Sequence, residues 1–250
     1  MRRFYLPPEC CTGAALQLDG REAYHALHVL RLKRGEAVMV LDGAGNEFSC
    51  EVETGSRDSL VLRVTKTNFV PPSPCPITLL VAIPKGKIIE SIIQKSVELG
   101  AHRIVPLLTG RVVIHLGERD KMAKQEKWQL MAIEAIKQCG AAWLLEIETP
   151  VTIEEFLARK EKFDLSLVGS LQTDRRHPRE CFQEFQSQHG HLPQSVAIWI
   201  GPEGDFTPDE LKTIQAAGAL PISLGRLVLR VETAAIYCLS ILNYELRTAH

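Results

Sequence analysis

The sequence predicts an α/β protein in which a small β-rich domain precedes a larger domain built on a mostly parallel sheet. From residue 77 onward, buried apolar runs alternate with amphipathic segments of helical spacing, a pattern typical of parallel sheets. Residues 1–70 instead contain short strand-like stretches. Between the two regions, "PPSPCP" at 71–76 is too rich in proline for a helix or a sheet interior, so we expect a linker there.

The first region, residues 1–70, reads as strands around one short helix. "EAVMVLDGAGNEFSCEVE" (36–53) places two apolar runs around "DGAGN", which is a hairpin signal. "SLVLRVTKT" (59–67) alternates apolar and polar residues, as a half-buried strand does. Between residues 21 and 36, apolar residues three to four apart predict a short helix.

The second region, residues 77–250, is expected to hold strands and helices in alternation. The apolar runs predict strands, and the segments that end on glycine or begin on a capping threonine predict helices. The expected strands are 77–84, 103–108, 163–169, 195–201 and 220–225, and the expected helices are 87–100, 126–140, 207–219 and 233–247.

The composition bounds the class of protein. Of the 250 residues, 45% are hydrophobic and 24% are charged, and the net charge of −1 excludes an overall basic surface for nucleic acid. No apolar run is long enough to span a bilayer or to act as a signal peptide, so we expect a cytoplasmic protein with no membrane partner. The seven cysteines show no ligand spacing, and we expect free thiols and no metal site.

"IGPEGDFTPDEL" (200–211) forms a turn between a buried strand and a helix. Thr207 is placed as the N-cap, Pro208 as the first helical residue, and Glu210 completes a capping box. The turn follows the carboxyl end of a parallel strand, where ligands of open α/β sheets bind. The carboxylate of Glu203 would repel a phosphate, so a ligand with hydroxyls or a cationic centre fits better. An ordinary βα turn remains the alternative.

"SLGRLVLRVETAA" (223–235) repeats this arrangement before the last expected helix. Leu227, Val228 and Leu229 lie in the loop between two arginines, Arg226 and Arg230, and apolar residues are unusual in loops. They either plug the core or form the wall of an apolar pocket for an aromatic base.

These two segments resemble the signature of the bacterial 16S ribosomal RNA uridine-N3 methyltransferases of the SPOUT superfamily. The resemblance covers nearly the whole chain. Further segments that carry it are "RRFYLPPE", "HALHVLRLKRGE", "AIPKGKIIESIIQKSVELGAHRIVPLLTGRVV" and "KWQLMAIEAIKQCG".

The resemblance implies a PUA-like β-barrel RNA-binding domain over 1–70 and a SPOUT domain with a C-terminal trefoil knot over 77–250. It implies S-adenosylmethionine (SAM) as cofactor, N3 of a uridine in 16S rRNA as substrate, the small ribosomal subunit as partner, and a homodimer. The cofactor would lie between the two glycine-containing turns. The expected cofactor-binding residues are Leu167, Gly169, Ile200, Gly201, Glu203, Gly204, Leu224, Gly225 and Leu229.

The sequence departs from the family pattern at three places. Asp205 stands where Gly is usual and Val231 where Thr is usual, and both changes are expected to matter little. Ala141 and Ala142 follow "QCG", where an Arg is common, and its loss would remove an RNA or active-site contact. A methyltransferase for a ribose 2′-OH or another base, a non-catalytic ribosome-binding factor, and a small-molecule α/β enzyme therefore remain alternatives.

Uracil N3 carries a proton at neutral pH, so the expected chemistry needs a base or an anion stabiliser. Glu232 is the candidate base, or else only an acid that favours the helix N-terminus. Arg230 cannot act as a base, but it can stabilise charge on a uracil oxygen, hold a phosphate or form a structural salt bridge. Candidate RNA-binding residues lie among the basic residues of the N-terminal segment and after the strand at 77–84: Arg2, Arg3, Arg31, Lys33, Arg34 and Lys85.

Overall fold

The protein forms two compact units in a computed structural model that describes residues 1–56, 58–111, 116–172 and 174–246. The first unit comprises Met1–Pro72 together with Ile133–Leu144, and the second comprises Ser73–Ala132 and the described residues from Leu145 onward. Two parts of the sequence predictions lie outside the described residues. They are residues 112–113, the end of the segment 82–113 that carries part of the family resemblance, and residue 247, the expected end of the last helix. The segment 133–144 was not expected to join the first unit.

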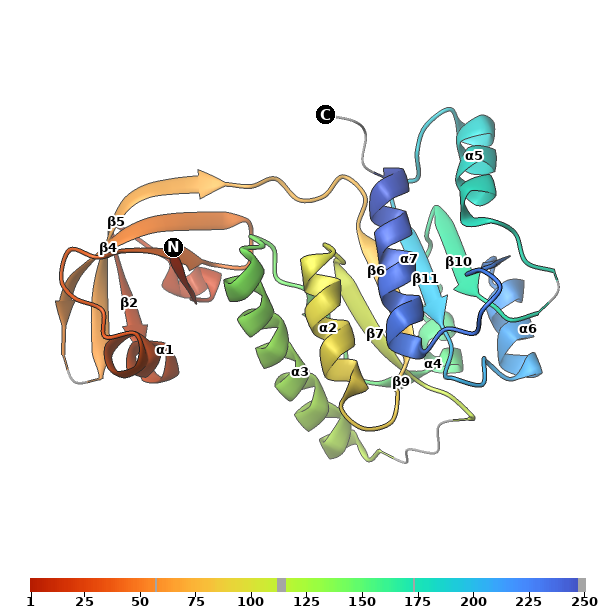
Figure 1. Cartoon of the computed structure of the whole chain (residues 1–250), viewed down its shortest axis with the longest axis horizontal. Coiled ribbons are helices and arrows are strands. Elements are labelled where there is room, and N and C mark those ends of the chain that lie inside the picture. Colours follow the sequence, from red (N-terminus) through yellow and green to blue (C-terminus); the bar gives the residue numbers. More distant parts are fainter. Residues whose placement is uncertain (57, 112–115, 173, 247–250) are drawn as a thin grey trace. The chain divides into compact units, whose positions relative to one another are not determined.

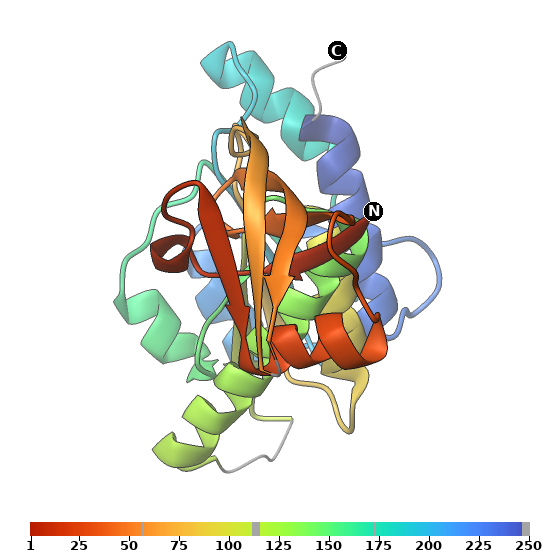
Figure 2. The same cartoon turned by 90° about the vertical axis from the view of Figure 1, so that its left-hand side faces the viewer.

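The first unit is a five-stranded sheet in the described part of the chain, with strand order β1-β3-β4-β5-β2 (Figure 2). Only the β1–β3 pair is parallel among the pairs of this sheet. The expected short helix is present and continues into one π-helical turn. The elements are β1 (Arg2–Tyr5), η1 (Pro8–Cys10), β2 (Ala15–Asp19), α1 (Gly20–Tyr24), η2 (His25–Val29), β3 (Ala37–Leu41), β4 (Asn46–Gly55) and β5 (Ser59–Phe69).

The predicted hairpin between β3 and β4 is confirmed, and a buried aspartate holds it. Asp42 accepts hydrogen bonds from the backbone amides of Ala44 and Asn46, at 2.8 and 2.9 Å. Gly45 has a φ of +96°, and a Cβ there would lie 2.7 Å from the ring of Trp143. Trp143 also donates to the carbonyl of Val70 at 2.9 Å. The segment 133–144 therefore packs directly on this hairpin.

The second unit contains a seven-stranded sheet in the described residues, with order β12-β10-β11-β6-β7-β8 and β9 paired to β7 (Figure 1). Every strand pair of this sheet is parallel, which confirms the α/β prediction. The trefoil knot stays a prediction. The strands are β6 (Ile77–Ala82), β7 (Arg103–Leu108), β8 (Glu146–Ile147), β9 (Val151–Thr152), β10 (Leu165–Gly169), β11 (Val196–Ile200) and β12 (Leu220–Ile222).

Helices cover both faces of this sheet. The helices are α2 (Ile88–Glu98), α3 (Glu118–Cys139), α4 (Ile153–Ala158), α5 (Pro178–His189), α6 (Pro208–Ala216) and α7 (Val231–Leu246). Helices α2 and α7 pack against each other on one face (Figure 1). On the other face, Val168 and Trp199 pack in one core cluster with Phe156 of α4 and Ile214 of α6. Because side chains alternate along a strand, Leu167 and Ile200 point to the α7 face.

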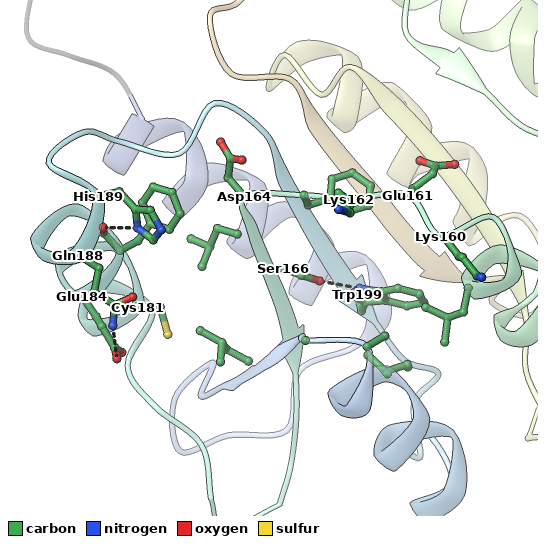
Figure 3. Close-up of a pocket in the computed structure, with 18 of the residues that line it drawn as sticks. Lys160, Glu161, Lys162, Asp164, Ser166, Cys181, Glu184, Gln188, His189 and Trp199 are labelled. Atoms are coloured by element: carbon green, nitrogen blue, oxygen red, sulfur yellow. Dashed lines mark hydrogen bonds between the residues drawn. The ribbon is translucent and has the colours of Figure 1, made fainter.

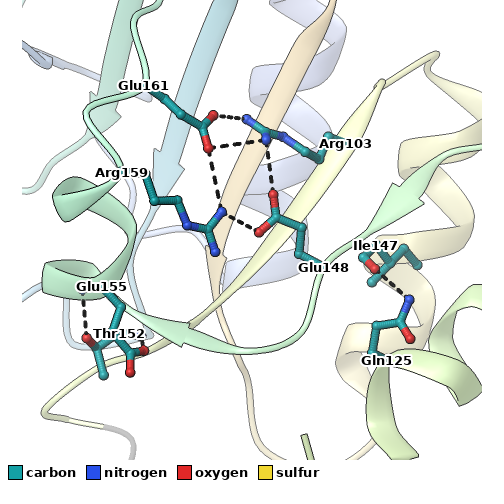
Figure 4. Close-up of polar contacts among 8 residues, drawn as sticks. All are labelled: Arg103, Gln125, Ile147, Glu148, Thr152, Glu155, Arg159 and Glu161. Carbon is teal, nitrogen blue, oxygen red and sulfur yellow. Dashed lines mark hydrogen bonds and ion pairs between the residues drawn. The ribbon is translucent and has the colours of Figure 1, made fainter. Parts of the chain in front are cut away.

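Four charged side chains tie β7, the β8–β9 connection and α4's C-terminal end together (Figure 4). Arg103 contacts Glu148 at 3.0 Å and Glu161 at 2.5 Å, while Arg159 contacts Glu148 at 2.6 Å. Burial raises the pKa of Glu161, but hydrogen bonds and positive charge from Arg103 and Arg159 outweigh it, so the pKa of this carboxyl lies below its usual value.

We expect Glu161→Gln to lower the free energy of unfolding by about 1 kcal/mol at pH 7, the size of a hydrogen-bonded ion pair near the surface. The lowered pKa means that this stabilisation is full above the unfolded-state pKa of about 4.3 and is lost as pH falls through the folded-state pKa. Urea unfolding of the wild type and the variant at pH 7 and pH 3 measures this loss of free energy. Glu154→Gln serves as control, because Glu154 is an exposed acid of α4. An equal loss of unfolding free energy at both pH values would mean that the ionised carboxylate of Glu161 is not the source of the stabilisation.

The remaining composition-based expectations concern cysteines, metals and membranes. All seven cysteines are free thiols. Burial raises the pKa of Cys238 to about 12, so its thiol stays protonated at neutral pH. Within the described residues, no group of three or more potential ligand side chains is placed to hold a metal ion, and no helix has the length and apolar character needed to cross a membrane.

Candidate cofactor site

The turn after β11 doubles back on itself. The amide of Asp205 donates to the carbonyl of Pro202 at 2.8 Å. A Cβ on Gly201 would lie 2.9 Å from the backbone nitrogen of Phe206, so only glycine fits there without displacing the turn. Gly201 is thus required by close approach rather than by a left-handed backbone, since its φ is not positive.

Helix α6 begins as the sequence predicts. Thr207 is the N-cap and accepts from the amide of Glu210 at 3.2 Å, while the Glu210 carboxylate accepts from the Thr207 amide at 2.7 Å. The same carboxylate also accepts from the amide of Gly110 at 2.8 Å. The capping box therefore also ties the loop after β7 to the start of α6.

The loop after β12 forms a second wall of the site and is more exposed to solvent than the turn after β11. Gly225 has a φ of +109°, with no other atom near a Cβ built on it. Leu227 and Val228 are 78% and 68% exposed. The side chain of Leu224 instead lies against the end of β10. A Cβ built on Gly169 would lie 3.2 Å from the Cδ1 of Leu224. The apolar residues of this loop therefore do not plug the core, and two of them are presented to solvent.

A small cavity lies between these two turns and the end of β10. Seven of the expected cofactor residues line it: Gly169, Ile200, Gly201, Glu203, Leu224, Gly225 and Leu229. Leu167 is fully buried in β10 and Gly204 lies beside Arg111, and neither is among the lining residues. Their roles in binding stay predictions.

Leu227 and Val228, expected either to plug the core or to form the wall of a pocket, line the cavity. Sequence reasoning missed several other lining residues: Ser170, Leu171, Arg175, Pro202, Asp205, Val231 and Ala234. Ser170 and Leu171 directly follow an expected strand, so their position at its carboxyl end was a usable signal. Arg175 donates to the carbonyl of Ser170 at 3.3 Å and contributes a positive charge to the lining. No spacing rule points to Arg175 or to Ala234.

The chemistry of this lining fits an adenosine-bearing cation. Apolar side chains such as Ile200 and Leu224 can contact an aromatic base, and backbone groups of the glycine turns can approach it closely. The carboxylates of Glu203 and Asp205 favour a cationic centre. The cavity volume is only about 50 Å³, whereas ligand sites usually measure about 300–1,000 Å³. A whole cofactor therefore needs more space than this cavity encloses.

The two candidate catalytic residues lie at the start of α7. Arg230 is exposed, and its carbonyl accepts from the amide of Ala234 at 2.8 Å. Glu232 is partly buried, and its Oε2 has no hydrogen-bond partner in the described structure. Neither residue lines the small cavity, although Val231 between them does. Both are thus neighbours in sequence of a lining residue, and their catalytic roles stay predictions.

The candidate RNA-binding residues are distributed over both units. In the first unit, Arg2 pairs with Glu36 at 3.0 Å, beside the segment that carries Arg31, Lys33 and Arg34. The side chains of Arg31, Lys33 and Arg34 are exposed. Arg3 instead donates to the carbonyls of residues 137 and 138 at the C-terminal end of α3. Lys85 is exposed in the second unit.

A larger cavity of about 640 Å³ lies in the second unit, near the amino ends of β10 and β12 (Figure 3). Trp199 donates to Ser166 at 3.1 Å, and Arg176 pairs with Glu184 at 2.6 Å. This cavity is lined by neither glycine turn. It lies at the strand ends opposite to those where ligands of open α/β sheets bind.

The comparisons with known proteins identify the class to which this chain belongs. Residues 71–243 match the family described as RNA methyltransferase domain, and residues 18–65 match RNA methyltransferase PUA domain. The chain is 31% identical over 246 residues to ribosomal RNA small subunit methyltransferase E of Synechocystis, covering 96% of this chain and 77% of that protein. It is 29% identical to the protein of the same name from Bacillus subtilis, covering 91% and 89%.

A solved structure is also similar to this chain. It is a methyltransferase from Legionella pneumophila with the cofactor SAM bound, at 33% identity and a TM-score of 0.85, covering 97% of this chain and 96% of that one.

The parallel sheet with its carboxyl-end cavity, preceded by a PUA domain, defines the chain as an RNA methyltransferase. The regions matched by these relatives cover nearly the whole chain rather than one motif. The chain belongs to the ribosomal RNA small subunit methyltransferase E family.

Proposed function

We propose that this protein transfers a methyl group from SAM to N3 of a uridine in 16S rRNA. One observation carries the proposal: the turns after β10, β11 and β12 enclose a cavity whose lining suits adenosine and a cationic centre. Proteins of this family are named for methylation of small-subunit rRNA, and a similar structure contains SAM. We propose that the nine residues predicted from the sequence contribute to cofactor binding, seven of them directly.

When bound, SAM supplies a methyl group on a sulfonium sulfur. The uracil N3–H bond must break as the new N3–carbon bond forms and the methyl–sulfur bond breaks. We assign the proton to the carboxylate of Glu232, whose Oε2 is buried and without a partner in the described structure. The exposed guanidinium of Arg230 stabilises negative charge on a uracil oxygen.

The function is tested by methyl transfer to small ribosomal subunits and to naked 16S rRNA that both lack the modification. Nucleoside digestion then separates 3-methyluridine from 2′-O-methylated products. Incorporation as 3-methyluridine at one position supports the proposal. A 2′-O-methylated product, or another base, supports the alternative left open by Ala141. Absence of SAM binding at millimolar concentration would support a non-catalytic ribosome-binding factor.

We propose that residues 1–70 bind RNA, that 71–76 form a linker, and that 77–250 form the methyltransferase domain. Arg2, Arg31, Lys33 and Arg34 would contact phosphates, since phosphate contacts need charge rather than sequence. Arg3 would act mainly by holding the end of α3. The small ribosomal subunit is the proposed partner, and we propose the cytoplasm as the location.

We propose further that the protein works as a homodimer with parts of two chains at each site. On α7, Tyr237 and Tyr244 are 44% and 72% exposed on one side of the helix, and the adjacent loop exposes Leu227 and Val228. Large exposed apolar groups that lie near one another often mark an interface.

We expect the wild-type chain to sediment at twice its 27.9 kDa mass. The double change Tyr237→Glu and Tyr244→Glu should give the monomer, because a buried charge without a partner is costly. Tyr24→Glu, at a tyrosine of the first unit that is 62% exposed, should leave the dimer intact. Sedimentation equilibrium at micromolar protein measures this, and a monomeric wild type would contradict the proposal.

A further inference from the structure

Asp205 has an unusual backbone for a residue with a side chain. Its φ is +67°, in the left-handed region that glycine prefers and that aspartate tolerates at some cost. The residue is nevertheless 7% exposed and lines the small cavity. A strained, buried acid at this place needs compensating interactions.

Its carboxylate makes two hydrogen bonds to backbone amides. Oδ1 accepts from Phe206 at 2.8 Å, which closes the turn locally. Oδ2 accepts from Leu171 at 3.0 Å, across a separation of 34 residues. Hydrogen bonds to an ionised acceptor are stronger than neutral ones. Asp205 therefore connects the turn after β11 to the segment after β10.

These two segments form one side of the cavity, and the opposite side is much less restrained. Arg111 donates to the carbonyl of Asp205 at 3.4 Å, which adds a contact to the held side. In the 224–229 loop, the amide of Gly225 donates to the Ser223 hydroxyl at 3.3 Å, while Leu227 projects into solvent. One wall is thus held by hydrogen bonds between distant segments, whereas the other presents apolar side chains to solvent.

We propose that Asp205 is a positioning residue that latches the segment 169–172 to the turn 201–206 and so pre-forms the fixed wall of the cofactor site. The link to the cofactor depends on the function proposed above. Without the latch, the binding-competent arrangement is only fractionally populated, and the apparent affinity falls by that fraction. This assigns a role to the position where the family resemblance leads one to expect glycine.

Asp205→Gly tests the latch, because glycine adopts a φ of +67° without strain while both acceptors are lost. In the absence of cofactor, we expect the Leu171 amide to exchange with solvent at least about 10-fold faster, in line with loss of one charged hydrogen bond. By calorimetry, we expect the dissociation constant for SAM to rise by about 3- to 30-fold.

Asp205→Asn keeps the volume and the tolerance for positive φ but supplies one acceptor instead of two, and should be intermediate in both measurements. Asp209→Asn removes the same charge from an exposed position on α6 and should match the wild type. Thermal unfolding identifies any variant that has lost its fold. If Asp205→Gly is folded yet exchanges at Leu171 and binds SAM as the wild type does, the inference is wrong.

If the proposed function is wrong, the exchange and binding measurements give a different combination of results. A wild type that does not bind SAM rejects the function and the cofactor role of the latch together. The Leu171 exchange rate, which needs no cofactor, still decides whether Asp205 holds the two segments together.

Discussion

Replacing Gly201 with alanine is expected to weaken SAM binding by about 10- to 100-fold. The new Cβ would lie 2.9 Å from the backbone nitrogen and 3.1 Å from the ring of Phe206, which is itself 1% exposed. Neither neighbour can yield easily, because one is backbone and the other is core. Overpacking of this kind costs about 1–3 kcal/mol. The turn must open, and Glu203 and Asp205 would then move with it.

Gly204→Ala is the matched control, because Gly204 does not line the cavity and its proposed contribution to binding is through the backbone, which alanine keeps. A Cβ there would meet the Nη1 of Arg111 at 3.1 Å, and a guanidinium at the end of a long side chain can rotate away. Calorimetric titration with SAM should give Gly204→Ala an affinity within about threefold of the wild type, because a flexible side chain yields at little cost. Equal losses for the two variants, or none for Gly201→Ala, would mean that the cofactor does not depend on this turn.

Replacing Glu232 with glutamine should lower kcat for methyl transfer by about 100-fold or more, the usual contribution of a general base. Glutamine keeps the size of the side chain and cannot take a proton from uracil N3. Since Glu232 does not line the small cavity, SAM binding should change by less than about twofold. Single-turnover kinetics with saturating SAM separates the chemical step from binding.

Glu245→Gln serves as control on the same helix. Glu245 contacts Arg179 at 3.5 Å, at the end of α7 distant in sequence from the site. Its variant should transfer methyl at the wild-type rate. If Glu232→Gln also keeps that rate, the proton goes elsewhere, and Glu232 is only a helix-entry acid.

Local rules predicted much of the fold correctly. The predicted apolar runs correspond to strands β6, β7, β10, β11 and β12. Thr207, Pro208 and Glu210 form the start of helix α6, as the types of these residues predict. Helices α4 and α5 were not predicted, although both begin with a capping box, at Thr152 and His177. A histidine N-cap is not a signal that the usual capping preferences include.

The site was predicted less completely, because contacts between distant residues leave no trace in local spacing. The bond from Leu171 to Asp205 spans 34 residues, and so the Asp205 substitution was expected to matter little. Likewise, a basic residue near the N-terminus gives no sign of its partner. Arg3 was expected to face RNA, yet its guanidinium holds carbonyls more than 130 residues away.

A crystal structure of this chain with SAM would show directly whether the two turns hold the cofactor. We expect adenosine between the 201–205 turn and an outwardly displaced 224–229 loop, with Gly169 and Ile200 in contact with it and the Asp205–Leu171 hydrogen bond intact. Density for the cofactor in the larger cavity beside Ser166 and Trp199, with the two turns still closed on each other, would contradict this expectation.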